Sequence, residues 1–130
     1  MKTIKQYIEE LGNQADILTV QQANIYFEKL AYKFPFTNLN KIDWKKVLVK
    51  EKCETFQQVA SWLNMMNIRD QNVILFWNDK EIAAISINLQ KIVATIHHIG
   101  ERHLFLYCPT VEYVIEWIRE KDLMIGLAPR

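Results

Sequence analysis

Glutamates and histidines are the side chains of this chain whose types and spacing could support catalysis. Glu112 and Glu116 lie four residues apart in Val111–Ile118, a run rich in β-branched and aromatic residues that predicts a strand. Alternate residues of a strand share one face, so the two carboxylates could act together as a general acid and a general base. The alternative is an exposed strand face whose charges discourage pairing with another sheet edge. We favour the exposed face.

The histidines do not form a pattern that is typical of a metal site. His97 and His98 are adjacent near the end of a predicted helix, and His103 opens the next predicted strand. Adjacent helical side chains point about 100° apart, unlike the i, i+4 pair that binds a metal. A histidine near a helix C-terminus is also favoured by the helix dipole alone. We therefore expect no metal and no cofactor.

Cysteines and glycines also lack the settings that catalysis needs. Cys53 and Cys108 are the only cysteines and show no CxxC or Cys–His spacing, which favours two reduced, partly buried thiols. The three glycines are isolated, so the chain contains no glycine-rich phosphate loop. The sequence therefore indicates a protein that is not an enzyme. A small enzyme that uses Glu112, Glu116 or His103 stays open as an alternative.

The composition is typical of one globular domain. The chain has 130 residues, of which 50% are hydrophobic and 24% charged, and its three glycines and three prolines leave little room for linkers. Its longest apolar run, Val73–Trp77, is far shorter than the roughly 20 residues of a membrane span. No long apolar stretch follows the N-terminal lysines, so we expect no signal peptide, no membrane partner and a cytoplasmic location.

The net charge of +1 hides a difference between the two parts of the chain. Residues 1–52 hold nine lysines and six acidic residues, which gives +3. Residues 53–130 hold seven basic and nine acidic residues, which gives −2. This balance is far from the strongly basic charge that nucleic-acid-binding domains usually show, so nucleic acid is not the favoured partner.

One basic segment nevertheless surrounds Trp44, an aromatic ring on which a base could stack. Burial of this ring by Ile42, Val47 and Leu48, with the lysines in solvent, is the simpler interpretation. A small nucleic-acid-binding or regulatory domain that uses the Lys41–Lys52 segment is kept as the alternative function. The lysines of the segment are Lys41, Lys45, Lys46, Lys50 and Lys52.

The first part of the chain, residues 1–68, reads as mainly helical. Apolar residues recur at helical spacing in Thr3–Leu11, in Thr19–Phe34 and in Thr55–Met66. Thr19 and Thr55 are each followed three residues later by glutamine, which is the pattern of a capping box. Gly12 and Pro35 are natural stops for the first two helices.

Residues 72–127 change to shorter, strand-like runs. Short links and polar turns favour an α+β fold in which the N-terminal helices pack on one face of a mostly antiparallel sheet of about five strands. One helix is inserted after the second strand, and the whole chain, 1–130, forms a single domain. The predicted order is strand Val73–Trp77, strand Ile82–Ser86, helix Asn88–His98, then strands His103–Tyr107, Val111–Ile118 and Leu123–Leu127.

Several pieces of this second part resemble a group of small bacterial toxin-immunity proteins, including those of contact-dependent inhibition systems. The pieces are Ile74–Asp79, Asn88–Ile92, Tyr113–Trp117 and Met124–Gly126. The resemblance implies a non-enzymatic protein that binds one cognate toxin domain, often a nuclease, and blocks its active site or docking surface. It implies no particular binding residue.

The leading hypothesis is therefore a cytoplasmic immunity protein that neutralises a bacterial toxin by stoichiometric occlusion. Acidic residues of predicted turns and strand faces could meet a basic toxin surface, because complementary charge speeds encounter and excludes wrong partners. Scattered solvated carboxylates are the simpler alternative. The candidate partner-binding residues are Asp79, Glu81, Glu112, Glu116 and Asp122, chosen from an acidic set that also contains Asp70 and Glu120.

Overall fold

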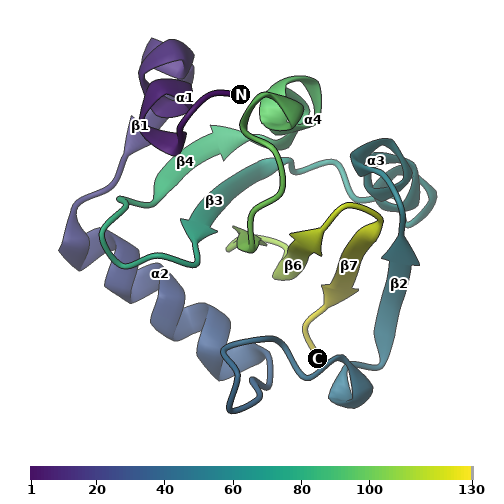
Figure 1. Ribbon diagram of the computed structural model, residues 1–130. Helices are drawn as coiled ribbons and strands as arrows, with labels where there is room; N and C mark the ends of the chain where they lie inside the picture. The colour runs from purple at the N-terminus through teal and green to yellow at the C-terminus, as the bar shows by residue number, and fades with distance from the viewer. Residues whose placement is uncertain (130) are drawn as a thin grey trace.

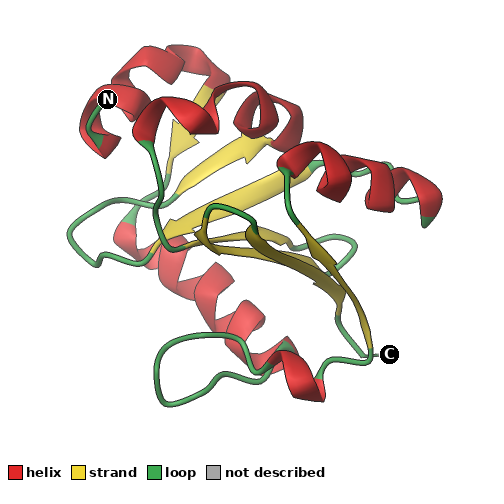
Figure 2. Ribbon diagram, turned by 45° about the vertical axis from the view of Figure 1, so that its right-hand side comes forward, coloured by secondary structure: helices red, strands yellow, loops and turns green. Residues whose placement is uncertain are grey.

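The computed structural model describes residues 1–129 and contains one seven-stranded antiparallel sheet between two covering layers (Figures 1 and 2). The strand order is β1-β4-β3-β5-β6-β7-β2. The α+β class and the antiparallel pairing are confirmed, whereas the prediction of about five strands is wrong. The strands are β1 Ala15–Ile17, β2 Val49–Cys53, β3 Asn72–Trp77, β4 Ile85–Asn88, β5 Leu104–Cys108, β6 Tyr113–Arg119 and β7 Asp122–Leu127.

The α-helices begin where the sequence predicts. Thr3 and Thr19 form complete capping boxes, in which the threonine side chain and the glutamine three residues later each accept a backbone N–H. Thr55 caps the third helix and Asn88 the fourth. The helices are α1 Ile4–Leu11, α2 Val20–Lys33, α3 Phe56–Met65 and α4 Leu89–Thr95, which continues into a short 3-10 turn, η3 (Ile96–Ile99).

Two strands within the first 68 residues were not predicted. β1 and β2 form the two edges of the sheet, pairing with β4 and β7 respectively. β1 has three residues, too few to show a period. β2 reads Val-Lys-Glu-Lys-Cys, and its first four residues are exposed, so it lacks the apolar alternation of a half-buried strand. Charges on an edge strand discourage pairing with other chains.

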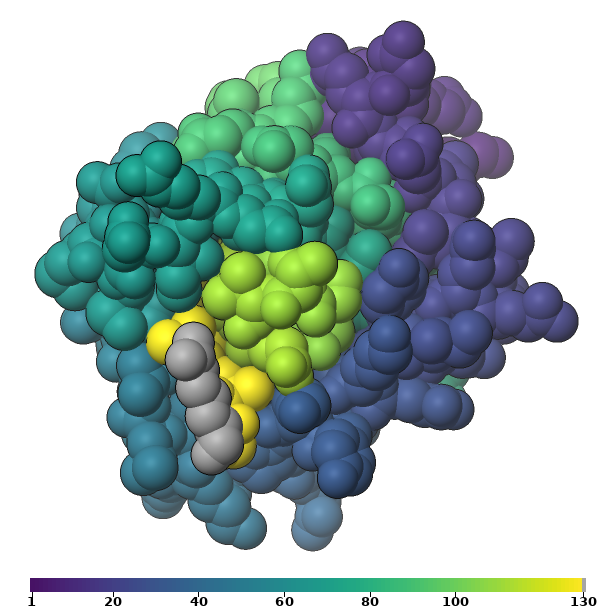
Figure 3. Space-filling view, turned by 180° about the vertical axis from the view of Figure 1, so that it is seen from behind, coloured from purple at the N-terminus to yellow at the C-terminus, as the bar shows by residue number. Residues whose placement is uncertain are grey.

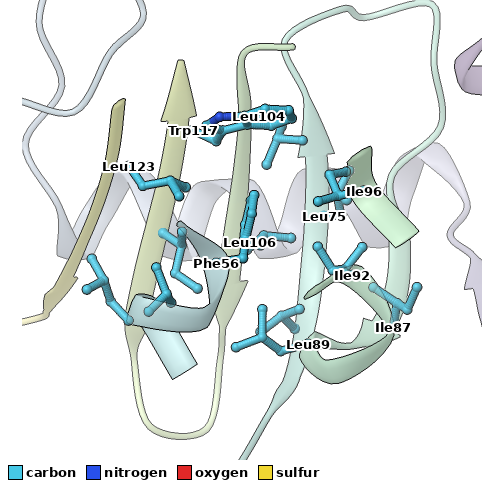
Figure 4. Packing of buried hydrophobic residues seen from close by; sticks show 14 of the residues in the cluster. Phe56, Leu75, Ile87, Leu89, Ile92, Ile96, Leu104, Leu106, Trp117 and Leu123 are labelled. Carbon is cyan, nitrogen blue, oxygen red and sulfur yellow. The ribbon is translucent and has the colours of Figure 1, made fainter. Parts of the chain in front are cut away.

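Helices cover both faces of the sheet, which corrects the prediction of a single covered face. α1, α3 and α4 pack on what we call the three-helix face, over side chains that include Leu75, Leu106 and Ile115 (Figures 2 and 4). α2 and segment 34–47, which is irregular apart from the 3-10 turn η2 (Trp44–Lys46), pack on the opposite side, the α2 face, over Ile74 and Phe105. The continuous apolar run Val73–Trp77 is explained by this arrangement, because alternate residues of β3 are buried on both faces.

Candidate interaction surface

The antiparallel order brings several turns to one end of the sheet. The β3–β4 and β6–β7 turns lie there, together with the residues that precede β5 and follow β2. β5 alone separates β3 from β6, so the strands that lead into the two turns run about 10 Å apart. Three candidate partner-binding residues, Asp79, Glu81 and Asp122, therefore lie at the same end.

Three more carboxylates, of Glu54, Glu101 and Glu120, lie at this end, which we call the acidic end. The acidic end contains six acidic and four basic residues, so its formal charge is −2. No sequence pattern groups Glu54 and Glu101 with the turn carboxylates, because β2 was not predicted and Glu101 lies between two predicted elements. The basic residues are Lys80, Arg102, Arg119 and Lys121.

Most carboxylates of the acidic end have no ion-pair partner within the described part of the chain. Asp122 is the exception, with its Oδ2 3.4 Å from Nε of Arg119. Within residues 1–129, no basic nitrogen lies within 4.0 Å of the other five. Two of them accept a backbone N–H instead: Asp79 from Glu81 at 2.9 Å, and Glu101 from Glu120 at 3.1 Å. These negative charges are available to a partner.

Glu112 lies at the opposite end of the sheet, in the turn between β5 and β6. Its backbone has φ +67°, a left-handed conformation that no strand adopts, so β6 begins one residue later. The predicted strand Val111–Ile118 is therefore too long at its start. The Glu112 carboxylate lies 3.2 Å from Nζ of Lys33 on α2.

A groove of about 590 Å³ runs between α2 and the β5–β6 turn. We call it the α2 groove. In Figure 3 this turn, in yellow-green, lies beside the blue residues of α2. The Lys33–Glu112 ion pair joins the two sides of the groove. Its exposed apolar walls include Ile25 and Tyr32, which is 86% exposed.

Glu116 is buried, with 1% of its surface exposed, so the prediction of an exposed strand face at this position is wrong. One carboxylate oxygen accepts the indole N–H of Trp44 at 2.7 Å. The other accepts Nε2–H of His103 at 2.8 Å and, at a longer 3.4 Å, the backbone N–H of Ile42. A buried carboxylate is stable only when donors replace its water, and three donors do so here.

His103 extends this polar network to the β3–β4 turn. The Asn78 amide lies 2.9 Å from His103 Nδ1 and donates to it, so the ring hydrogen is on Nε2, where it reaches Glu116. The network thus links a turn of the acidic end to segment 34–47. Neither Glu116 nor His103 lines the α2 groove or the smaller hollow described below.

Trp44 faces the sheet rather than the solvent. Its ring lies over Gly126, where an added Cβ would be 2.8 Å from the Trp44 Cζ3 atom. Ile42 and Val47 are buried around it as predicted, but Leu48 is 90% exposed. This placement does not favour Trp44 as a stacking ring for nucleic-acid bases.

A second hollow, of about 210 Å³, opens on the three-helix face at the acidic end. It lies between the start of α3 and the turn that follows α4. Phe56, Trp117 and Leu123 form its floor, and Glu54 and Glu120 belong to its rim. We call it the α3–α4 hollow.

The cysteines and histidines form no further site in residues 1–129. Cys53 and Cys108 are free and more fully buried than predicted, and burial raises the pKa of the Cys53 thiol above its ordinary value. In this range no three His, Cys, Asp or Glu side chains gather where they could hold a metal ion. Nor does any helix of the range have the length and apolar character needed to cross a membrane.

Residues 1–126 match the family model described as CdiI immunity protein EcoliA0-like. The chain belongs to this family. It is therefore a bacterial immunity protein of a contact-dependent inhibition system, as the resemblance implied. The match also covers the helical first part, which the sequence alone assigned to no family. A search of curated proteins found no match. Immunity proteins of this family are generally not enzymes, and the family implies a toxin partner.

Proposed function

We propose that this immunity protein binds one cognate toxin domain stoichiometrically through the acidic end of its sheet and so blocks the toxin. The observation that carries the proposal is the gathering of carboxylates at this end, most of them without an ion-pair partner in residues 1–129, in a member of the CdiI immunity family. Asp79, Glu81 and Asp122 are its candidate contact residues. Glu116 is not included because it is buried, and Glu112 is not included because it lies at the opposite end.

The charge of this end suggests the kind of toxin surface that it meets. A toxin that cleaves nucleic acid needs a basic surface to hold phosphates. An acidic protein surface of similar extent competes for that surface, speeds encounter and excludes substrate at the same time. We therefore propose a nuclease toxin that is bound in the cytoplasm, over or beside its substrate-binding surface.

The direct experiment begins with the neighbouring gene: where it encodes a large secreted protein, the C-terminal domain of that protein is the probe. Isothermal titration of the purified immunity protein into this domain should give one-to-one binding, and the complex should lack the nuclease activity of the free toxin. A lack of binding, or a toxin that stays fully active in the complex, would contradict the proposal.

Charge reversal then tests the surface. Replacing Asp79, Glu81 and Asp122 together by lysine should weaken binding by about 100-fold at low salt, and the loss should shrink as salt is added. The matched control replaces Glu9, Glu10 and Glu28, on the outer sides of α1 and α2, by lysine and changes the net charge equally. Equal affinities of the two variants would exclude the acidic end as the binding surface. Circular dichroism checks that both variants are folded.

A further inference from the structure

We propose that the α3–α4 hollow receives a basic side chain, an arginine or a lysine, from the toxin domain. The inference rests on the proposed function and adds to it the place and the chemistry of one contact. It concerns the three-helix side of the acidic end, away from the β3–β4 turn.

The floor of the hollow is apolar and firmly held. The Phe56 and Trp117 rings meet edge to face, with centroids 5.6 Å apart and planes at 75°. Trp117 pairs across the sheet with Leu123 on one side and Leu104 on the other (Figure 4). Both rings are 7% exposed, so their visible surface faces the hollow and little else. A rigid aromatic floor suits an anchor side chain.

The volume of the hollow indicates how much of a partner it can hold. Sites that enclose a small molecule usually measure about 300–1,000 Å³. The 210 Å³ here is smaller, and it is enough for the end of one long side chain. A folded toxin can supply such a side chain from its surface without unfolding a segment.

The rim charges favour a cation. Within residues 1–129, neither Glu54 nor Glu120 has a basic nitrogen within 4.0 Å. The aliphatic part of an arginine or lysine side chain can lie against the Trp117 and Phe56 rings, while its guanidinium or ammonium group donates hydrogen bonds to these carboxylates. Lys121 also lines the hollow and reduces its negative charge.

An anion is disfavoured even though α3 begins beside the hollow. The Thr55 hydroxyl already accepts the Gln58 N–H at 3.2 Å, and the Gln58 side chain accepts the Glu54 N–H at 2.6 Å. Two backbone donors at this helix start are thus used by the chain itself, and Glu54 adds a negative charge next to them. The α2 groove offers no comparable preference, because Glu112 there is already paired with Lys33.

Three variants test whether the group that enters the hollow is positively charged. The affinity of each variant for the toxin domain is measured by isothermal titration. Replacing Glu54 and Glu120 by lysine should weaken binding by about 10- to 100-fold. Lys121→Glu should strengthen it several-fold, because it removes the opposing charge. The control, Glu28→Lys with Glu112→Lys in the α2 groove, carries the same charge change and should alter the affinity by less than about threefold.

A spectroscopic measurement on the wild-type protein tests the same contact without any substitution that could disturb folding. The indole N–H signals of Trp117 and Trp44 are followed by NMR as the toxin domain is added to the wild-type protein. Trp117 should shift on binding, whereas Trp44, which is bonded to Glu116 on the other face, should not.

The outcomes separate this inference from the proposed function. A wild-type protein that fails to bind the toxin domain contradicts the proposed function itself. A wild-type protein that binds, with the Glu54 and Glu120 double variant binding equally well and Trp117 unshifted, overturns only the inference. A loss of affinity in the control variant instead would place the contact in the α2 groove.

Discussion

The two faces of the sheet are covered in different ways, and the difference explains why a glutamate is buried in one of them. The three-helix face lies under α1, α3 and α4, which satisfy their own backbone hydrogen bonds and need only apolar contacts below. The α2 face lies partly under segment 34–47, which is irregular apart from the 3-10 turn η2. Its Ile42 N–H and Trp44 indole N–H point toward the sheet, and Glu116 accepts both. An irregular cover therefore requires a polar residue in the strand beneath it.

The largest expected effect comes from removing that acceptor. Glu116→Ala leaves the donors of Trp44, His103 and Ile42 unpaired in a buried site, which should lower the free energy of unfolding by about 4 kcal/mol. Urea denaturation measures the loss. Glu116→Gln keeps an acceptor and nearly the same shape, so it should lose much less. Equal losses in the two variants would show that one retained acceptor oxygen does not hold the segment, and that both carboxylate oxygens are needed.

The neighbouring residue provides the contrast on the other face. Ile115→Ala creates a cavity under the helices and should cost about 3 kcal/mol, spread over the whole structure. Hydrogen exchange distinguishes the two cases. Glu116→Ala should increase exchange mainly in residues 36–47, whereas Ile115→Ala should increase it in all protected elements alike. A uniform response to both would mean that segment 34–47 is not held separately by the glutamate.

Gly126 tests the same segment from the sheet side. An added Cβ would lie 2.8 Å from Trp44 Cζ3 and 3.0 Å from Val47 Cγ1, so Gly126→Ala should displace the segment and cost about 2 kcal/mol. A fluorescence change of Trp44 should accompany the loss of stability in thermal melts. A variant as stable as the wild type would indicate that segment 34–47 can move away from the added methyl group without a loss of stability.

Helix capping should contribute equally to the stability of the helices on both faces, because its hydrogen bonds are local. Thr3→Ala on α1 and Thr19→Ala on α2 each remove a complete capping box and should each cost about 1 kcal/mol. Matched thermal melts of the two variants measure this. A much larger effect at one of them would show that its threonine also supports the packing of that face.

A pH dependence shared by the two faces has no effect near neutral pH and appears only in alkaline solution. Burial raises the pKa of Tyr107, on the α2 face, to about 12, and it also raises the pKa of Tyr113 on the three-helix face. The unfolded chain releases these phenol protons near pH 10, before the folded chain does, so stability should fall as the pH rises from about 10 to 12. Tyr107→Phe should make this fall shallower in urea titrations, and an unchanged slope would contradict the assignment.

The helix starts were predictable because their signals are local. Each capping threonine and its glutamine lie within one helical turn, so no distant contact decides their geometry. The apolar run of β3 was equally plain, since burial on both faces leaves no polar position in it. The two edge strands were not predictable in this way. β2 carries charges on both sides, and only its pairing with β7 makes it a strand.

The candidate site also has features that local sequence predicts and features that only the strand order decides. Local sequence showed that Asp79, Glu81 and Asp122 belong to polar turns, but only the strand order brings them to one end with Glu54 and Glu101. Sequence spacing also suggested one face for Glu112 and Glu116. In the structure the two side chains lie in different surroundings. Glu112 has a left-handed backbone conformation and precedes the strand, whereas Glu116 lies within it and accepts a hydrogen bond from Trp44, 72 positions away in the chain.

Residue types and short-range spacing were thus enough to establish the α+β class, the helix starts, most strands of the second part and the lack of a recognisable catalytic motif. The two-sided cover, the buried glutamate, the acidic end and the α3–α4 hollow depend on contacts between residues far apart in the chain. The physical reason is that hydrogen bonds within a turn or helix depend on neighbours a few residues away. Burial and charge clustering depend instead on which strands pair and on what covers each face.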